Sequence, residues 1–273
     1  MSNERLTRDQ QREAARAKAK AMREAEKKSQ GRKKIAVIVS WILGVSVIAL
    51  FVGMAVQNVQ SENQTPVVGS PKNAIFNDGV RIGKDLKVIT SKDQVDPAIH
   101  NIIIWQDPQC VACHNFEVPN MPKIRELVKS GQYTLEIHPI SFMDGYSQNN
   151  YSSRAASALM CVAADSPDQF FDYNEAQYNN WPEEGTAGPT SDQLAELAKS
   201  VGVTNSDALS CIKKDTWAKW AISKAPDGNT VVPGTDAKFT GTPFIYVNGK
   251  QLGGTPNPDE FLQMLQQAAP ITK

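Results

Sequence analysis

Residues Ile102–Glu117, IIIWQDPQCVACHNFE, are the most informative segment for the fold of this chain. Its apolar run, Ile102–Trp105, is typical of a strand that is buried on both faces. Asp107-Pro108 marks a turn, and two cysteines in a C-x-x-C pair follow it at the start of a predicted helix. A strand that delivers such a pair to a helix start is typical of a redox-active dithiol.

The spacing of the two cysteines has a chemical reason. Two intervening residues place both sulfurs on the first helical turn, close enough to form a small disulfide ring. Cys110 is expected at the helix N-terminus, where free N–H groups and the helix dipole stabilise an anion and lower a thiol pKa. Cys113 lies one turn deeper, and we expect it to be the buried thiol that resolves mixed disulfides.

The segments around the motif predict a parallel strand–helix–strand unit. Its parts are Ile99–Trp105, Val111–Lys129 and Tyr133–Ile137, and the helix is expected to bend at Pro119 or Pro122. Short strands are expected earlier in the chain, at Gly79–Gly83 and Leu86–Ile89.

A block of four helices is predicted after this unit, at Tyr151–Ala164, Pro167–Tyr178, Asp192–Val201 and Ser206–Lys224. Thr204 with Asp207 is expected to begin the last of them. The domain then closes with a strand, Phe244–Val247, an Asn-Gly hairpin and a return strand at Gln251–Leu252. The sequence N-P-D-E begins the final helix, Pro258–Gln267.

The charges divide the chain into a basic tail, an uncharged span and an acidic domain. Residues 1–34 carry twelve Lys and Arg against five Asp and Glu, residues 35–57 carry neither, and the remainder carries seventeen against twenty-four. An acidic domain argues against a nucleic-acid partner, which requires a basic face.

The uncharged span 35–57 is predicted to be a transmembrane anchor, because roughly 20 apolar residues cross a bilayer. A cleaved signal peptide and a buried core helix are the alternatives. The long basic tail and the lack of a clear small-x-small cleavage site favour an uncleaved anchor. The excess of Lys and Arg before the span predicts that residues 1–34 stay in the cytoplasm and that the part of the chain after the span is exported. Residues 58–72 then form a polar linker, and residues 73–273 form the domain.

The order of elements is that of a thioredoxin fold with an all-helical insertion at about 148–225. Thr242-Pro243, directly before the strand at Phe244, is a second motif of this fold. Residues 73–273 resemble the DsbA-like thiol–disulfide oxidoreductases, in particular the membrane-anchored actinobacterial type. The residues that carry the resemblance are Cys110-Val111-Ala112-Cys113, Phe116-Glu117 and Thr242-Pro243.

The resemblance implies a role for each matching residue. Cys110 corresponds to the nucleophile and Cys113 to the resolving thiol. Thr242 corresponds to the residue whose backbone aligns a substrate chain, and Pro243 to a cis-proline that packs against the dithiol. Glu117 corresponds to a carboxylate that assists proton transfer from Cys113, with a surface helix glutamate as the alternative.

The dipeptide between the cysteines departs from the family pattern. Strongly oxidising members usually have proline and histidine there, whereas this chain has Val111-Ala112, which offers neither a side-chain hydrogen bond nor a charge. We therefore expect a less depressed pKa for Cys110 and a weaker oxidant. His114 lies on another part of the helix and is not expected to substitute for the missing histidine.

The remaining cysteines, Cys161 and Cys211, are expected to form a structural disulfide across the helical insertion. Two separate buried thiols are the alternative, and an oxidising compartment favours the bridge. The resemblance implies the same bridge, since the actinobacterial proteins that this chain resembles have a similar pair. A zinc site made of all four cysteines is disfavoured because this second pair lacks close spacing.

We therefore expect an enzyme without a cofactor that exchanges disulfides with exported cysteine-containing proteins. Its main expected role is to promote the oxidative folding of these proteins. The resemblance implies a membrane redox partner that re-oxidises the dithiol. Two alternatives remain. Cys110–His114 also reads C-x-x-C-H, the attachment signature of c-type haem, with His114 as the axial ligand of an electron-transfer protein. A non-catalytic thioredoxin-like binding module is the other.

Overall fold

The structure is a computed structural model that describes residues 69–228 and 230–271. The described residues belong to one compact unit. The predicted tail, 1–34, the predicted anchor, 35–57, and most of the predicted linker lie outside the described residues. Within the described ranges, no helix is long and apolar enough to span a membrane.

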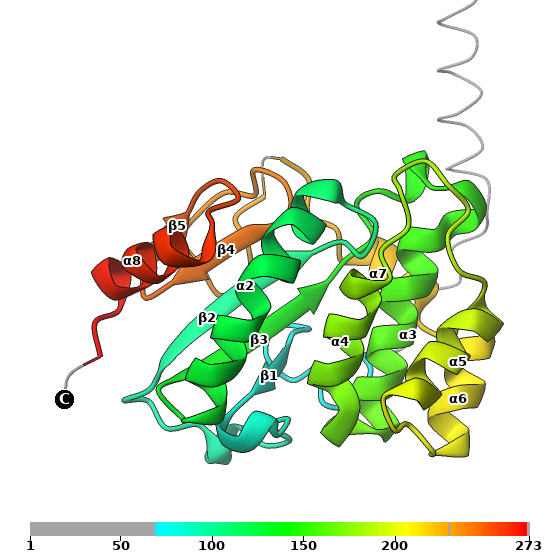
Figure 1. Cartoon of the computed structure of the whole chain (residues 1–273), viewed down its shortest axis with the longest axis horizontal. Helices are drawn as coiled ribbons and strands as arrows, with labels where there is room; N and C mark the ends of the chain where they lie inside the picture. Colours follow the sequence, from blue (N-terminus) through cyan, green and yellow to red (C-terminus); the bar gives the residue numbers. More distant parts are fainter. Residues whose placement is uncertain (1–68, 229, 272–273) are drawn as a thin grey trace, which may run out of the picture. The chain divides into compact units, whose positions relative to one another are not determined.

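A five-stranded sheet of order β1-β3-β2-β4-β5 forms the centre of the domain (Figure 1). Its strands are Val80–Ile82 (β1), His100–Gln106 (β2), Tyr133–Pro139 (β3), Phe244–Val247 (β4) and Lys250–Leu252 (β5). β2 and β3 are parallel, as the sequence predicts, and β1, β4 and β5 each pair antiparallel to their neighbours.

β2 is the central strand, and its two faces enter different apolar clusters. Ile102 and Ile104 belong to the main core, whereas Ile103 and Trp105 belong to a smaller cluster with Phe244. This explains why the apolar run of β2 is continuous rather than alternating, because both of its faces are covered.

Two helices, α2 (Val111–Lys129) and α8 (Pro258–Ala268), cover one face of this sheet (Figure 1). Their apolar sides meet where Phe116 packs edge-on against Phe261, with 5.2 Å between the ring centroids. α2 continues through Pro119 and Pro122 as one helix of 19 residues. Asn257 caps α8 by accepting hydrogen bonds from two backbone N–H groups, and this cap fits the predicted helix start.

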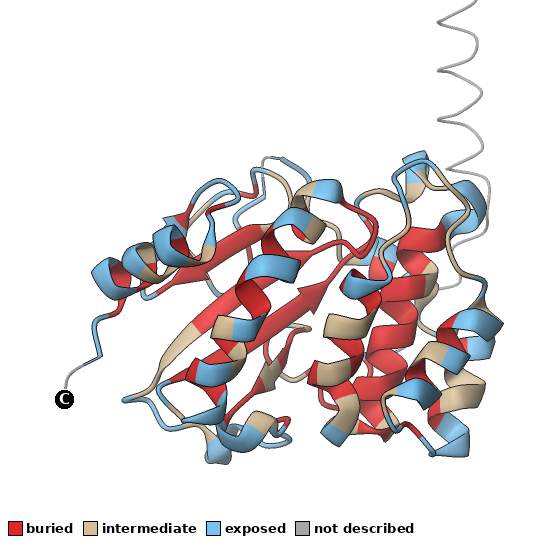
Figure 2. Ribbon diagram, in the orientation of Figure 1, coloured by how far each residue is buried: buried red, intermediate tan, exposed pale blue. Residues whose placement is uncertain are grey.

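The predicted insertion is a helical layer beside the sheet, in which nearly all of α3 is buried (Figure 2). Most of α3 consists of small residues such as Ala and Ser, which allow its neighbours to approach it closely. The helices of this layer are α3 (Tyr151–Asp165), α4 (Phe170–Asn179), α5 (Ser191–Ser200), α6 (Ser206–Lys213) and α7 (Ala218–Ser223).

Three predicted local features were wrong. Leu86–Ile89 is not a strand, since Lys84–Leu86 forms a 3₁₀ turn with positive φ at Leu86. The single predicted helix Ser206–Lys224 is divided into α6 and α7, because Asp215 adopts φ +49°, which a continuous helix excludes. Asn205, not Thr204, is the N-cap residue of α6, and its side chain accepts hydrogen bonds from two backbone N–H groups of the first turn.

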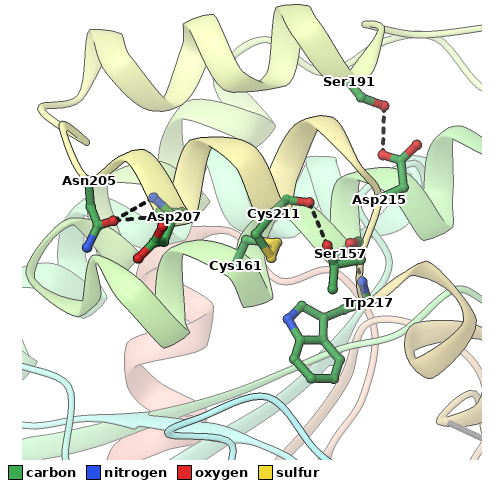
Figure 3. Close-up of a disulfide and its surroundings, with 10 residues drawn as sticks. Ser157, Cys161, Ser191, Asn205, Asp207, Cys211, Asp215 and Trp217 are labelled. Atoms are coloured by element: carbon green, nitrogen blue, oxygen red, sulfur yellow. Dashed lines mark hydrogen bonds between the residues drawn. A yellow bond between two sulfur atoms is a disulfide. The ribbon is translucent and has the colours of Figure 1, made fainter.

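A disulfide joins Cys161 on α3 to Cys211 on α6, with 5.7 Å between their Cα atoms (Figure 3). The chain that follows is also held against α3, because the backbone N–H of Trp217 donates to the hydroxyl of Ser157 at 2.9 Å. The bridge and this hydrogen bond therefore fix α6 and the start of α7 on α3.

Candidate active site

Cys110 and Cys113 lie where β2 passes into α2. Cys110 is the N-cap residue of α2, with extended backbone angles, and Cys113 lies in the first turn. Both are free thiols. Cys110 keeps 7% of its residue surface exposed, whereas Cys113 is fully buried. A molecule in solution therefore meets the sulfur of Cys110 first.

The environment of Cys110 favours its thiolate. A hydrogen bond from the thiol of Cys113 is the largest cause. Together with the backbone N–H groups of Cys113 and Ala112 it lowers the pKa of Cys110 to about 6, against the opposing effect of burial. These N–H groups belong to the first turn of α2, where a helix leaves its donors unpaired. Cys110 is thus mainly ionised at neutral pH.

Cys113 has the opposite character. Burial raises its pKa well above the usual thiol value, because a charged sulfur in an apolar pocket loses its hydration. The backbone N–H of Asp107 faces its sulfur at 3.5 Å, and Tyr178 packs against both cysteines. One partly accessible, ionised sulfur beside one fully buried, neutral sulfur is the asymmetry that a nucleophile and a resolving thiol require.

The Thr242-Pro243 segment, distant in sequence, lies beside the dithiol. The peptide bond between these residues is cis, and the carbonyl oxygen of Thr242 lies 3.5 Å from the sulfur of Cys110. The pairing of β4 with β2 produces this contact, since Phe244 stands opposite Trp105 in the register of the two strands.

Glu117 lies one helical turn after Cys113 and is buried, so the alternative of a surface glutamate was wrong. The side-chain amide of Asn174 on α4 donates to one carboxyl oxygen at 3.2 Å, and the other oxygen has no hydrogen-bond partner among the described residues. Burial raises the pKa of Glu117 to about 8. The group lines a cavity of about 370 Å³ that Tyr178 and Arg125 also line.

Asp107 is a site residue that the sequence analysis treated only as part of a turn. Its carboxylate accepts hydrogen bonds from the backbone N–H groups of Gln109 and Met143 and from the hydroxyl of Ser152, at 2.7–2.8 Å. Burial raises its pKa to about 6. The available signal was an acid directly after a buried strand and three residues before Cys110.

His114 contacts the end of α4. Its ring stacks on Trp181 with 4.7 Å between centroids, and its Nδ1 lies 3.1 Å from the carbonyl oxygen of Tyr178. One nitrogen is therefore engaged by the backbone and one face of the ring is covered, which does not favour the axial-ligand role of the haem alternative.

Comparison with known proteins agrees with this geometry. A family model described as Thioredoxin matches residues 96–267, and the chain belongs to this family. Among solved structures, reduced DsbA from Mycobacterium tuberculosis is 26% identical with a TM-score of 0.57, over 70% of this chain and 92% of that one. The disulfide oxidoreductase DsbG from the same organism is 26% identical with a TM-score of 0.56, over 71% and 89%. The resemblance to DsbA-like oxidoreductases is thus confirmed.

Curated relatives share the same region. The serine/threonine-protein kinase PknE of M. tuberculosis is 30% identical over 63% of this chain, and the matching region spans only 29% of the kinase. Disulfide bond formation protein D of Bacillus subtilis is 26% identical over 63% of this chain and 73% of its own length. The likeness to the kinase therefore concerns less than a third of that protein.

Proposed function

We propose that this protein is a thiol–disulfide oxidoreductase that passes the Cys110–Cys113 disulfide to exported cysteine-containing proteins and so promotes their oxidative folding. The observation that carries the proposal is the opposed acidity of the two sulfurs, with the pKa of Cys110 lowered to about 6 and that of Cys113 raised. The structural likeness to DsbA and DsbG supports it.

The reaction follows from this asymmetry. A substrate thiolate attacks the sulfur of Cys110 in the oxidised protein, the Cys110–Cys113 bond breaks, and the sulfur of Cys113 takes the electron pair. A second substrate thiolate then attacks the substrate's sulfur in the mixed disulfide, and Cys110 leaves as a thiolate. Its low pKa makes Cys110 a good leaving group in this second step. Two electrons have passed from the substrate to the dithiol.

Glu117 supplies a proton to Cys113 in this proposal. Cys113 is fully buried and its thiolate is unfavourable, so it requires a proton as the protein disulfide opens. The pKa of Glu117, about 8, keeps this group mainly protonated at neutral pH. The cavity along Glu117 gives the carboxyl group access to exchangeable protons.

The backbone of Thr242 aligns the substrate chain, because its carbonyl lies beside the sulfur of Cys110, and Pro243 holds this segment against the dithiol. The Cys161–Cys211 bridge stabilises the insertion. The span 35–57 anchors the protein with its N-terminus in the cytoplasm and its domain outside, where a membrane redox partner re-oxidises the dithiol. The charge distribution of the sequence supports this topology.

A trapping experiment tests the function. Cys113→Ser keeps a hydroxyl donor beside Cys110 but cannot resolve a mixed disulfide. We expect it to accumulate covalent, dithiothreitol-sensitive adducts with exported proteins, whereas Cys110→Ser with intact Cys113 accumulates none. If Cys113→Ser forms no more adducts than Cys110→Ser, Cys110 is not the nucleophile and the proposal fails.

A further inference from the structure

The loop between α4 and α5, residues 180–190, contacts residues on both sides of Cys110. The indole N–H of Trp181 donates to the carbonyl of Gln109 at 3.1 Å, and the side-chain amide of Gln109 donates to the carbonyl of Thr186 at 3.2 Å. The ring of Trp181 also stacks on His114, which lies directly after Cys113. This loop therefore lies against the start of α2.

The loop is itself fixed by α3. The guanidinium of Arg154 donates to the carbonyls of Pro189 and Ala187, at 2.8 and 3.2 Å. Gly188 adopts φ +58°, and a Cβ atom at this position would lie 2.5 Å from the ring of Tyr151. Only glycine is compatible with both constraints, so the position of the loop relative to α2 is determined by packing.

From this loop, the carboxylate of Glu184 reaches the helix start. One of its oxygens accepts a hydrogen bond from the backbone N–H of Val111, the first residue of α2, at 2.7 Å. The backbone N–H groups of the next two residues, Ala112 and Cys113, help to lower the pKa of Cys110. The first turn of α2 contains no acidic residue of its own. Two anions, a carboxylate and a thiolate, thus share one set of helix N-terminal donors.

We propose that Glu184 is a positioning residue that sets the strength of this oxidant: its carboxylate occupies the first N–H of α2, repels the Cys110 thiolate, and so makes the disulfide less oxidising. The inference rests on the proposed function and adds a determinant of its redox equilibrium. Like charges at one helix terminus disfavour each other. A less stable thiolate means a less stable reduced form, and the disulfide is then reduced less readily.

The consequence is clearest in the equilibrium with glutathione. Two glutathione thiols transfer two electrons to the protein, the Cys110–Cys113 bond breaks, and the disulfide of glutathione forms. Above the pKa of Cys110 one proton is released, because Cys110 stays ionised while Cys113 is protonated. Any change in that pKa alters the equilibrium constant at neutral pH, but not at a pH below it.

The magnitude follows from the measured effect of a charge at a helix end. Neutralising Glu184 is expected to lower the pKa of Cys110 by about 0.5 unit. At pH 7 this corresponds to an increase of about threefold in the equilibrium constant for reduction by glutathione, and at pH 5 to almost no change. Glu184 is exposed, so the difference should diminish at high salt.

The test compares Glu184→Gln with Glu183→Gln in the full-length protein. The first variant keeps an amide oxygen for the N–H of Val111 and removes only the charge. The second removes the same charge from the neighbouring exposed residue. The measurements are the pKa of Cys110, from the ultraviolet absorbance of its thiolate, and the glutathione equilibrium at pH 7 and pH 5.

We expect the lower pKa and the threefold change at pH 7 in Glu184→Gln alone. An unchanged pKa of Cys110 in Glu184→Gln would overturn the proposal, since the hydrogen bond to Val111 and not the charge would then matter. An equal shift in Glu183→Gln would also overturn it, since general surface charge would then explain the data. A wild-type dithiol that never equilibrates with glutathione would instead refute the proposed function, and the pKa measurement would still decide the role of Glu184.

Discussion

Removing the thiol of Cys113 is the most direct test of how the site acidifies Cys110. The hydrogen bond from that thiol is the largest cause of the lowered pKa of about 6. Hydrogen bonds to charged groups contribute about 1.5–3 kcal/mol, and a thiol is a weak donor, so we take about 1.5 kcal/mol. Cys113→Ala should therefore raise the pKa of Cys110 by about one unit, to roughly 7.

The matched control is Cys113→Ser, whose hydroxyl donates to the same sulfur. We expect its Cys110 to stay near the wild-type pKa, so that about 90% is ionised at pH 7, against about half in Cys113→Ala. Ultraviolet absorbance of the thiolate across a pH titration measures both variants, and the rate of alkylation at each pH gives an independent value. If the two variants share one pKa near 6, the backbone N–H groups of α2 alone stabilise the thiolate and the reasoning is wrong.

Two further predictions concern stability and the buried acid. Because the pKa of Glu117 is raised to about 8, the folded state loses stability as pH rises from about 4.5 towards 8. Glu117→Gln should remove this loss, which makes the protein more stable by roughly 3 kcal/mol at pH 7 and no more stable below about pH 4.5. Denaturant unfolding at both pH values measures this, and an equal gain at both would contradict the ionisation argument. The Cys161–Cys211 bridge closes a loop with a sequence separation of 50 residues, so Cys161→Ala with Cys211→Ala should cost about 4 kcal/mol and lower Tm by roughly 10 °C. A loss below about 1 kcal/mol in the double variant would show that the bridge does not constrain the unfolded chain.

The sequence predicted the features that depend on local patterns. The continuous apolar run of β2, the C-x-x-C pair at the start of α2 and the Asn-Pro start of α8 each combine a short motif with a local physical reason. The sequence also predicted the parallel pairing of β2 with β3, because a helix that links two strands of one sheet favours a right-handed crossover between parallel strands. The break between α6 and α7 was missed, since the hydrogen bond from Trp217 to Ser157 on α3 is not local in sequence.

The type of chemistry could be predicted from local sequence patterns, because the C-x-x-C pair follows a buried strand and Thr242-Pro243 directly precedes another strand. How the pKa values of the site are adjusted became clear only from the three-dimensional arrangement. Burial converts Glu117 and Asp107 into groups of raised pKa, and packing of a distant loop brings Glu184 to the first N–H of α2. Desolvation and charge interactions depend on distance in space, and separation along the chain does not reveal that distance.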